Sequence, residues 1–161
     1  MKKAILLLVV FLSTTKVINA QTIKSDGVRL RILRLNHVGK TYKLNTEDST
    51  LTYFRYLGKV RTAKGKAYKI LTSTWIWGLS HRATNRILVY TTDNRYVGNY
   101  YLTVIGDLPD HIKNNKLVFP NKGQDCDSQI VTYIDFSKGL PKEFFRKCKG
   151  NSGDIYTFST D

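Results

Sequence analysis

The sequence predicts a mainly β domain, a single antiparallel β-sandwich or barrel, and three observations support this. Val, Ile, Thr, Tyr, Phe and Trp cluster in runs of roughly five to ten residues. Residues that favour turns separate these runs. No long segment shows a helical period, and no repeat of solenoid or propeller length occurs. Together these features are typical of an antiparallel fold around one hydrophobic core.

The first twenty residues have the layout of a secretory signal peptide. Lys2 and Lys3 supply the positive end, an apolar stretch follows from Ala4 to Leu12, and Ala20 precedes the expected cleavage point. This stretch is far shorter than the roughly twenty residues of a membrane-spanning helix, and nothing later approaches that length. We therefore expect export to the periplasm or the extracellular space. Residues 21–161 have the length of one domain, and no pattern indicates an oligomeric state.

The segment from Val28 to Leu35 begins the β pattern. Apolar residues alternate with Arg29 and Arg31, which predicts a strand, and the phase slips at Leu33, which predicts a bulge. The next two runs, Thr50 to Leu57 and Lys66 to Leu79, are separated by a turn sequence that contains a glycine. We expect them to form a hairpin.

A second hairpin is expected between Ile87 to Thr92 and Arg95 to Ile105, because Asp93 and Asn94 tolerate the backbone conformation of a tight turn. Shorter strands follow at three places: Lys116 to Phe119, Ile130 to Phe136 and Asp154 to Ser159.

The segment from Leu140 to Lys149 fits two structures. Pro141 near its start and Gly150 after its end are typical of a short helix near 141–149. The same residues also fit a strand that pairs with the last strand across the turn from Gly150 to Gly153.

The two cysteines, Cys126 and Cys148, are expected to form one structural disulfide in an oxidising compartment. Their separation of twenty-two, without a CxxC or a neighbouring histidine, is not typical of a metal site or a redox pair. Asp125 and Asp127 flank Cys126, but with Asn121 they depart from the spacing of a twelve-residue calcium loop. No phosphate-binding glycine motif is present, which disfavours nucleotide chemistry. From these spacings and this absence together, we expect neither a metal nor a cofactor.

Positive charge is concentrated in the N-terminal half. From Gly27 to Tyr100 there are fourteen Lys or Arg against three acids, whereas Tyr101 to Asp161 holds eight of each. With so few acids nearby, the cations of this half cannot all be buried in ion pairs, so they must create a positive surface. Interleaved aromatic rings add flat faces for stacking. The candidate ligand-binding residues are Arg29, Arg31, Tyr53, Arg55, Lys69, Trp75, Trp77 and Arg82.

Trp75 and Trp77 share one face of their predicted strand. If that face is the core, they are packing residues; if it is the outer face, they form an exposed apolar strip. We favour the core, because large apolar patches are seldom exposed.

Three functions fit these features. The leading hypothesis is a non-enzymatic exported domain whose basic, aromatic surface binds an anionic partner: an envelope glycan, a lipid headgroup or an acidic polymer. The second is a subunit or inhibitor that binds one acidic protein. The third is a small secreted hydrolase with His81 as base and Asp107 or Asp110 as its partner. Since turn chemistry also accounts for these three residues, their catalytic roles are not assigned.

Overall fold

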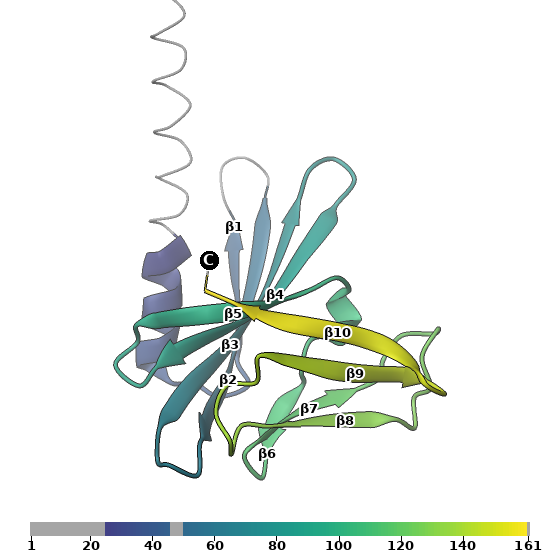
Figure 1. Cartoon of the computed structure of the whole chain (residues 1–161). Coiled ribbons are helices and arrows are strands. Elements are labelled where there is room, and N and C mark those ends of the chain that lie inside the picture. Colours follow the sequence, from purple (N-terminus) through teal and green to yellow (C-terminus); the bar gives the residue numbers. More distant parts are fainter. Residues whose placement is uncertain (1–24, 46–49, 161) are drawn as a thin grey trace, which may run out of the picture.

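Two antiparallel sheets make up the computed structural model, which describes residues 25–45 and 50–160. The larger sheet has the strand order β1-β2-β3-β4-β5-β10-β9, and the smaller has the order β6-β7-β8 (Figure 1). The strands and the short 3-10 helix are β1 (Thr41–Asn45), β2 (Leu51–Arg61), β3 (Ala67–Trp77), β4 (Arg82–Thr91), β5 (Tyr96–Leu102), η1 (Ile105–Asp107), β6 (His111–Lys113), β7 (Lys116–Pro120), β8 (Val131–Asp135), β9 (Glu143–Lys149) and β10 (Ser152–Ser159). The predicted mainly β, sandwich-like fold is therefore confirmed.

Both predicted hairpins of the N-terminal half are present. Strands β2 and β3 pair across a turn in which Gly65 has a φ of 81°, a conformation that glycine adopts at no steric cost. Strands β4 and β5 pair across a turn that contains Asn94 with a φ of 68°. The proposed signal peptide, residues 1–20, lies outside the described residues.

The predicted strand with a bulge between Val28 and Leu35 is wrong, because residues 25–35 form a helix. Val28 and Ile32 are four residues apart, which places them on one side of a helix. Ile32 and Leu33 are almost fully buried against the large sheet. Asn36, with a φ of 53°, ends the helix, and its backbone N–H donates to the Ile32 carbonyl. The alternation with arginine therefore reflected the two sides of a helix.

The short helix considered near 141–149 is also wrong, since these residues form β9, which pairs with β10. Burial alternates along β9: Phe144 and Arg146 point inward, whereas Phe145 and Lys147 are exposed. The strand alternative, with pairing across the turn from Gly150 to Gly153, is the one that the structure contains.

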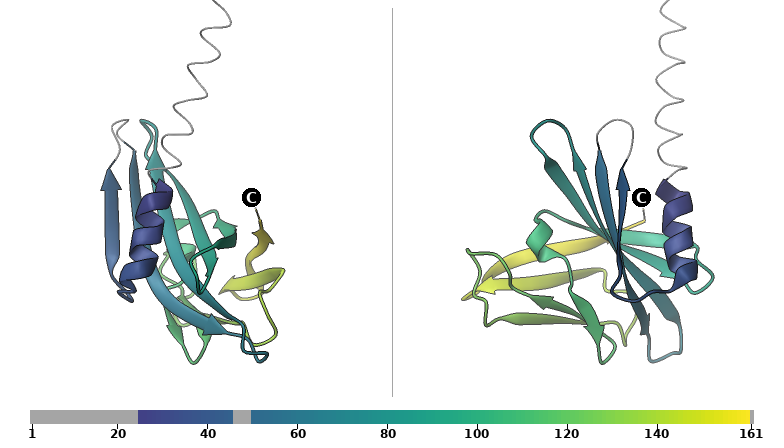
Figure 2. Two further views of the ribbon diagram at one scale, coloured as in Figure 1. Left: turned by 90° about the vertical axis from the view of Figure 1, so that its left-hand side faces the viewer. Right: turned by 180° about the vertical axis from the view of Figure 1, so that it is seen from behind.

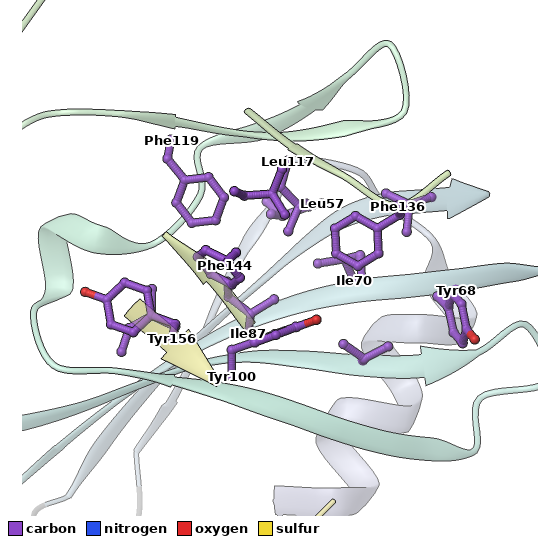
Figure 3. Close-up of a cluster of buried hydrophobic side chains, with 14 residues drawn as sticks. Leu57, Tyr68, Ile70, Ile87, Tyr100, Leu117, Phe119, Phe136, Phe144 and Tyr156 are labelled. Carbon is purple, nitrogen blue, oxygen red and sulfur yellow. The ribbon is translucent and has the colours of Figure 1, made fainter. Parts of the chain in front are cut away.

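Two hydrophobic clusters lie on opposite faces of the large sheet. The first is enclosed by strands β2–β5 and the β9–β10 hairpin of the large sheet and by the small sheet, and its side chains point toward one another in Figure 3. Its buried members are Leu57, Val60, Tyr68, Ile70, Ile87, Val89, Tyr100, Leu102, Leu117, Phe119, Ile134, Phe136, Phe144 and Tyr156. The second cluster packs under the helix and comprises Ile32, Leu33, Phe54, Tyr56, Leu71, Leu88 and Tyr90. The large sheet thus carries the helix on one face and β6–β8 on the other (Figure 2).

A disulfide joins Cys126 and Cys148, as predicted, and ties the loop before β8 to the end of β9. Asn121 reinforces this junction, because its buried Nδ2 donates to the backbone carbonyls of Asp127 (2.9 Å) and Cys148 (3.0 Å). Within the described part of the chain, no helix has the length and apolar character needed to cross a membrane.

Candidate functional site: an aromatic and arginine surface

Five side chains gather on the helix-bearing face of the large sheet, beyond the part that the helix covers. Cross-strand partners point to the same side of a sheet, so the register identifies this group. Trp77 pairs with Arg82, Trp75 with Thr84, and Arg86 with Tyr101. Leu71, on the same side of β3 as the two tryptophans, packs under the helix. We call Trp75, Trp77, Arg82, Arg86 and Tyr101 the aromatic–arginine surface.

The two tryptophans form a fixed pair. Their ring centroids are 5.7 Å apart with an interplanar angle of 28°. The Nε1 of Trp77 donates to Oγ1 of Thr84 at 3.2 Å, and the Arg82 guanidinium lies 5.9 Å from the Trp77 ring centroid. Because the indole is held from two sides, a flat face is already in place for a ligand.

Core packing of the tryptophans, the interpretation favoured from sequence, is wrong for Trp75. Its exposed fraction is 39%, Trp77 is half-buried, and Tyr101 is 50% exposed. The physical reason is the limited reach of the helix. Ile32 and Leu33 cover the sheet around Leu71 and Leu88, whereas the tryptophans lie at the far end of β3.

The charge of this surface is uncompensated by its own strands. None of the strands β1 to β5 contains an Asp or a Glu. Of the three acids counted in this half of the sequence, Asp93 lies in the turn between β4 and β5, and Glu47 and Asp48 lie outside the described residues. Among the described residues, neither Arg82 nor Arg86 forms an ion pair. Both arginines are exposed, and a guanidinium group can bind an anion through two parallel hydrogen bonds.

The other predicted cations of this half do not join the surface. Arg29, on the helix, pairs with Asp26 at 2.7 Å and donates to Ser25. Arg31 is exposed on the helix. Lys69 is only 7% exposed, and its Nζ donates to the carbonyl of Leu33 at the end of the helix (3.1 Å) and to Oδ1 of Asn94 (2.5 Å).

Lys69 therefore has a structural position. Burial, with a smaller contribution from the charge of Lys59, lowers the pKa of Lys69. A cation at this place also compensates the partial negative charge at the C-terminus of the helix.

Tyr53 and Arg55 lie on the opposite face of the sheet, where they line an open pocket of about 340 Å³ together with Thr72, Asp110 and Lys122. The Asp110 carboxylate lies 2.7 Å from the Lys122 ammonium and 3.6 Å from Arg55. Hydrogen bonds from Lys122 and from His111 lower the pKa of Asp110 to about 2. Because Asp110 already pairs with Arg55 and Lys122, the positive charge of this pocket is partly neutralised. The pocket should therefore attract an anion less strongly than the aromatic–arginine surface.

The three residues of the hydrolase hypothesis have separate environments. His81 is exposed in the turn between β3 and β4, with a φ of 49°. Asp107 is buried, lies 2.7 Å from Nη1 of Arg146 and accepts a hydrogen bond from the Tyr156 hydroxyl. Asp110 is held by Lys122 and His111. Within residues 25–45 and 50–160, no hydrogen bond or ion pair joins His81 to either aspartate.

Comparison with protein-family models, with curated proteins and with solved structures finds no match. The surface must therefore be interpreted from its own residues. Sequence reasoning identified Trp75, Trp77 and Arg82 but missed Arg86 and Tyr101. Strand alternation places Arg82 and Arg86 on the same side of β4, and this pattern is visible in the sequence. Only the pairing of β4 with β3 and β5 shows that the two arginines lie beside the tryptophans and Tyr101.

Proposed function

We propose that this protein is a non-enzymatic binding domain of an exported protein, and that its aromatic–arginine surface binds an anionic partner. The observation that carries the proposal is the stacked pair of exposed Trp75 and half-buried Trp77 beside Arg82 and Arg86. Neither arginine has an ion pair among the described residues, and their strands contain no acid. The disulfide between Cys126 and Cys148 is compatible with an exported location.

Arginine and tryptophan contribute different interactions to such a site. The arginines supply salt-dependent attraction, which acts on any anion and speeds its approach. The tryptophans supply selectivity for partners with flat or apolar portions, because a stacked ring contributes about 1–3 kcal/mol. A partner that combines both, such as an acidic glycan, an anionic lipid or an acidic polymer, matches the surface better than a simple ion.

The test is tryptophan fluorescence titrated with polygalacturonate, single-stranded DNA and lipopolysaccharide at low and high salt. We expect a saturable change with at least one probe that weakens as salt increases. The double variant Arg82→Ala, Arg86→Ala should weaken binding about tenfold and reduce the slope of log affinity against log salt by about two. Lys138→Ala with Lys149→Ala, two exposed lysines elsewhere, is the charge-matched control. Equal effects of both double variants would refute the proposed site.

A further inference from the structure

The turn between β3 and β4 projects an apolar tip beyond the aromatic–arginine surface. Leu79 is fully exposed, at 103% of its reference area, in a turn where Gly78 and His81 both have positive φ. In Figure 1 this turn stands at the top, away from β6–β10. An isolated exposed leucine is common. Here, however, Leu79 is only two residues beyond Trp77, in the same hairpin as Arg82, which is the first residue of β4.

We propose that the β3–β4 hairpin tip inserts into the surface of an anionic lipid membrane, with Leu79 in the acyl region. The inference rests on the proposed function and deepens it by naming the partner. Tryptophan side chains favour the membrane–water interface, and arginines keep their charge in the headgroup layer while their stems cross apolar surroundings. The order of residues from the tip, Leu79, then Trp77 and Arg82, then Trp75, is the order that a lipid interface presents.

The spacing along β4 agrees with this arrangement. Arg82 begins the strand next to the tip, and Arg86 lies four residues further, or about 13 Å at strand spacing. Arg82 is therefore placed to meet lipid phosphates directly. Arg86 is placed outside the headgroups and beyond a Debye length of about 8 Å at physiological salt, so its attraction to an anionic surface is largely screened there and increases at low salt. A soluble polymer that stacks on the indoles accounts for the tryptophans and arginines but gives no role to Leu79.

The experiment measures binding of the purified protein to vesicles of phosphatidylcholine alone and of equal parts phosphatidylcholine and phosphatidylglycerol. We expect binding to the anionic vesicles only, with quenching of tryptophan emission when the acyl chains carry bromine. Leu79→Ser should weaken vesicle binding about tenfold, the loss expected for one leucine side chain. Ile155→Ser, at a 64% exposed isoleucine on β10, is the matched control and should bind like the unaltered protein.

The outcomes separate the two proposals. Binding to polygalacturonate or DNA, without binding to anionic vesicles, would refute the membrane inference and leave the proposed function intact. Vesicle binding that is unquenched by brominated chains, or equal in Leu79→Ser and Ile155→Ser, would also refute insertion of the tip. Failure of vesicles and of every other anionic probe would refute both.

Discussion

The buried ion pair between Asp107 and Arg146 provides the sharpest test of the fold. The exposed fraction is 1% for Arg146 and 6% for Asp107, and the Tyr156 hydroxyl donates a hydrogen bond to the same carboxylate. Burial, followed by this hydrogen bond, raises the pKa of Tyr156. Removing one member of such a pair leaves the other charge buried without compensation, at a cost of about 3–5 kcal/mol. For a domain of this size that corresponds to a loss of about 10 °C in melting temperature.

Asp107→Asn and Arg146→Met are each expected to lose this amount, measured by urea unfolding monitored by circular dichroism. The double variant carries neither buried charge, so it should lose clearly less than the sum of the two single losses. Asp135→Asn is the control, because Asp135 is exposed and lies 3.7 Å from Lys116; it should change stability by less than about 0.5 kcal/mol. Additive losses in the double variant, or single losses as small as the control, would show that this pair is not a buried, coupled unit.

Three further results are expected. Gly98→Ala should destabilise the protein by several kcal/mol, because the new Cβ would lie 2.3 Å from the Ser159 carbonyl oxygen. The control Gly123→Ala should be tolerated, because its Cβ meets nothing within 4 Å. Similar melting temperatures for the two variants would contradict this close approach of β5 and β10. The stability that Asp110 contributes should be fully present above about pH 4 and be lost as pH falls toward 2, because the pKa of Asp110 in the folded protein is lowered from 3.8. Asp110→Asn should reduce the dependence of the free energy of unfolding on pH in that range. An unchanged dependence would refute this contribution. Thiol labelling of denatured, unreduced protein should find no free thiol, and full labelling would disprove the disulfide. Reduction should lower the free energy of unfolding by about 3 kcal/mol, as expected for a bridge of sequence separation 22.

Local patterns predicted the strands where turn chemistry and side-chain alternation agree. The β2–β3 and β4–β5 hairpins are specified by a few adjacent residues, Gly65 in one turn and Asn94 in the other, so a short window of sequence is sufficient. The disulfide was predictable because the chain has only two cysteines. These features depend little on the rest of the fold.

Tertiary packing decided the segments that local patterns left ambiguous or misassigned. Residues 25–35 carry apolar and basic residues at spacings that fit either a strand or a helix, and only the apolar face of the sheet under Ile32 and Leu33 selects the helix. In the same way, Phe144 and Arg146 fit a helix or a strand until β10 is present to pair with β9. Arg146 illustrates the limit most clearly. A fully buried arginine requires Asp107, which lies thirty-nine residues earlier in the chain and on another element.

The same packing explains why the predicted binding residues divided among three environments. The described helix is eleven residues long, or about 16 Å, whereas β3 extends for about 36 Å. Whatever its orientation, such a helix cannot cover the whole face. It buries Lys69 under its C-terminal end and leaves Trp75 and Trp77 uncovered. Strand alternation then sends Tyr53 and Arg55 to the opposite face, where Asp110 binds the arginine. Among the described residues, this sequence thus places two arginines without ion pairs beside the tryptophans, at the end of the sheet that the helix does not reach, and we expect a partner to bind there.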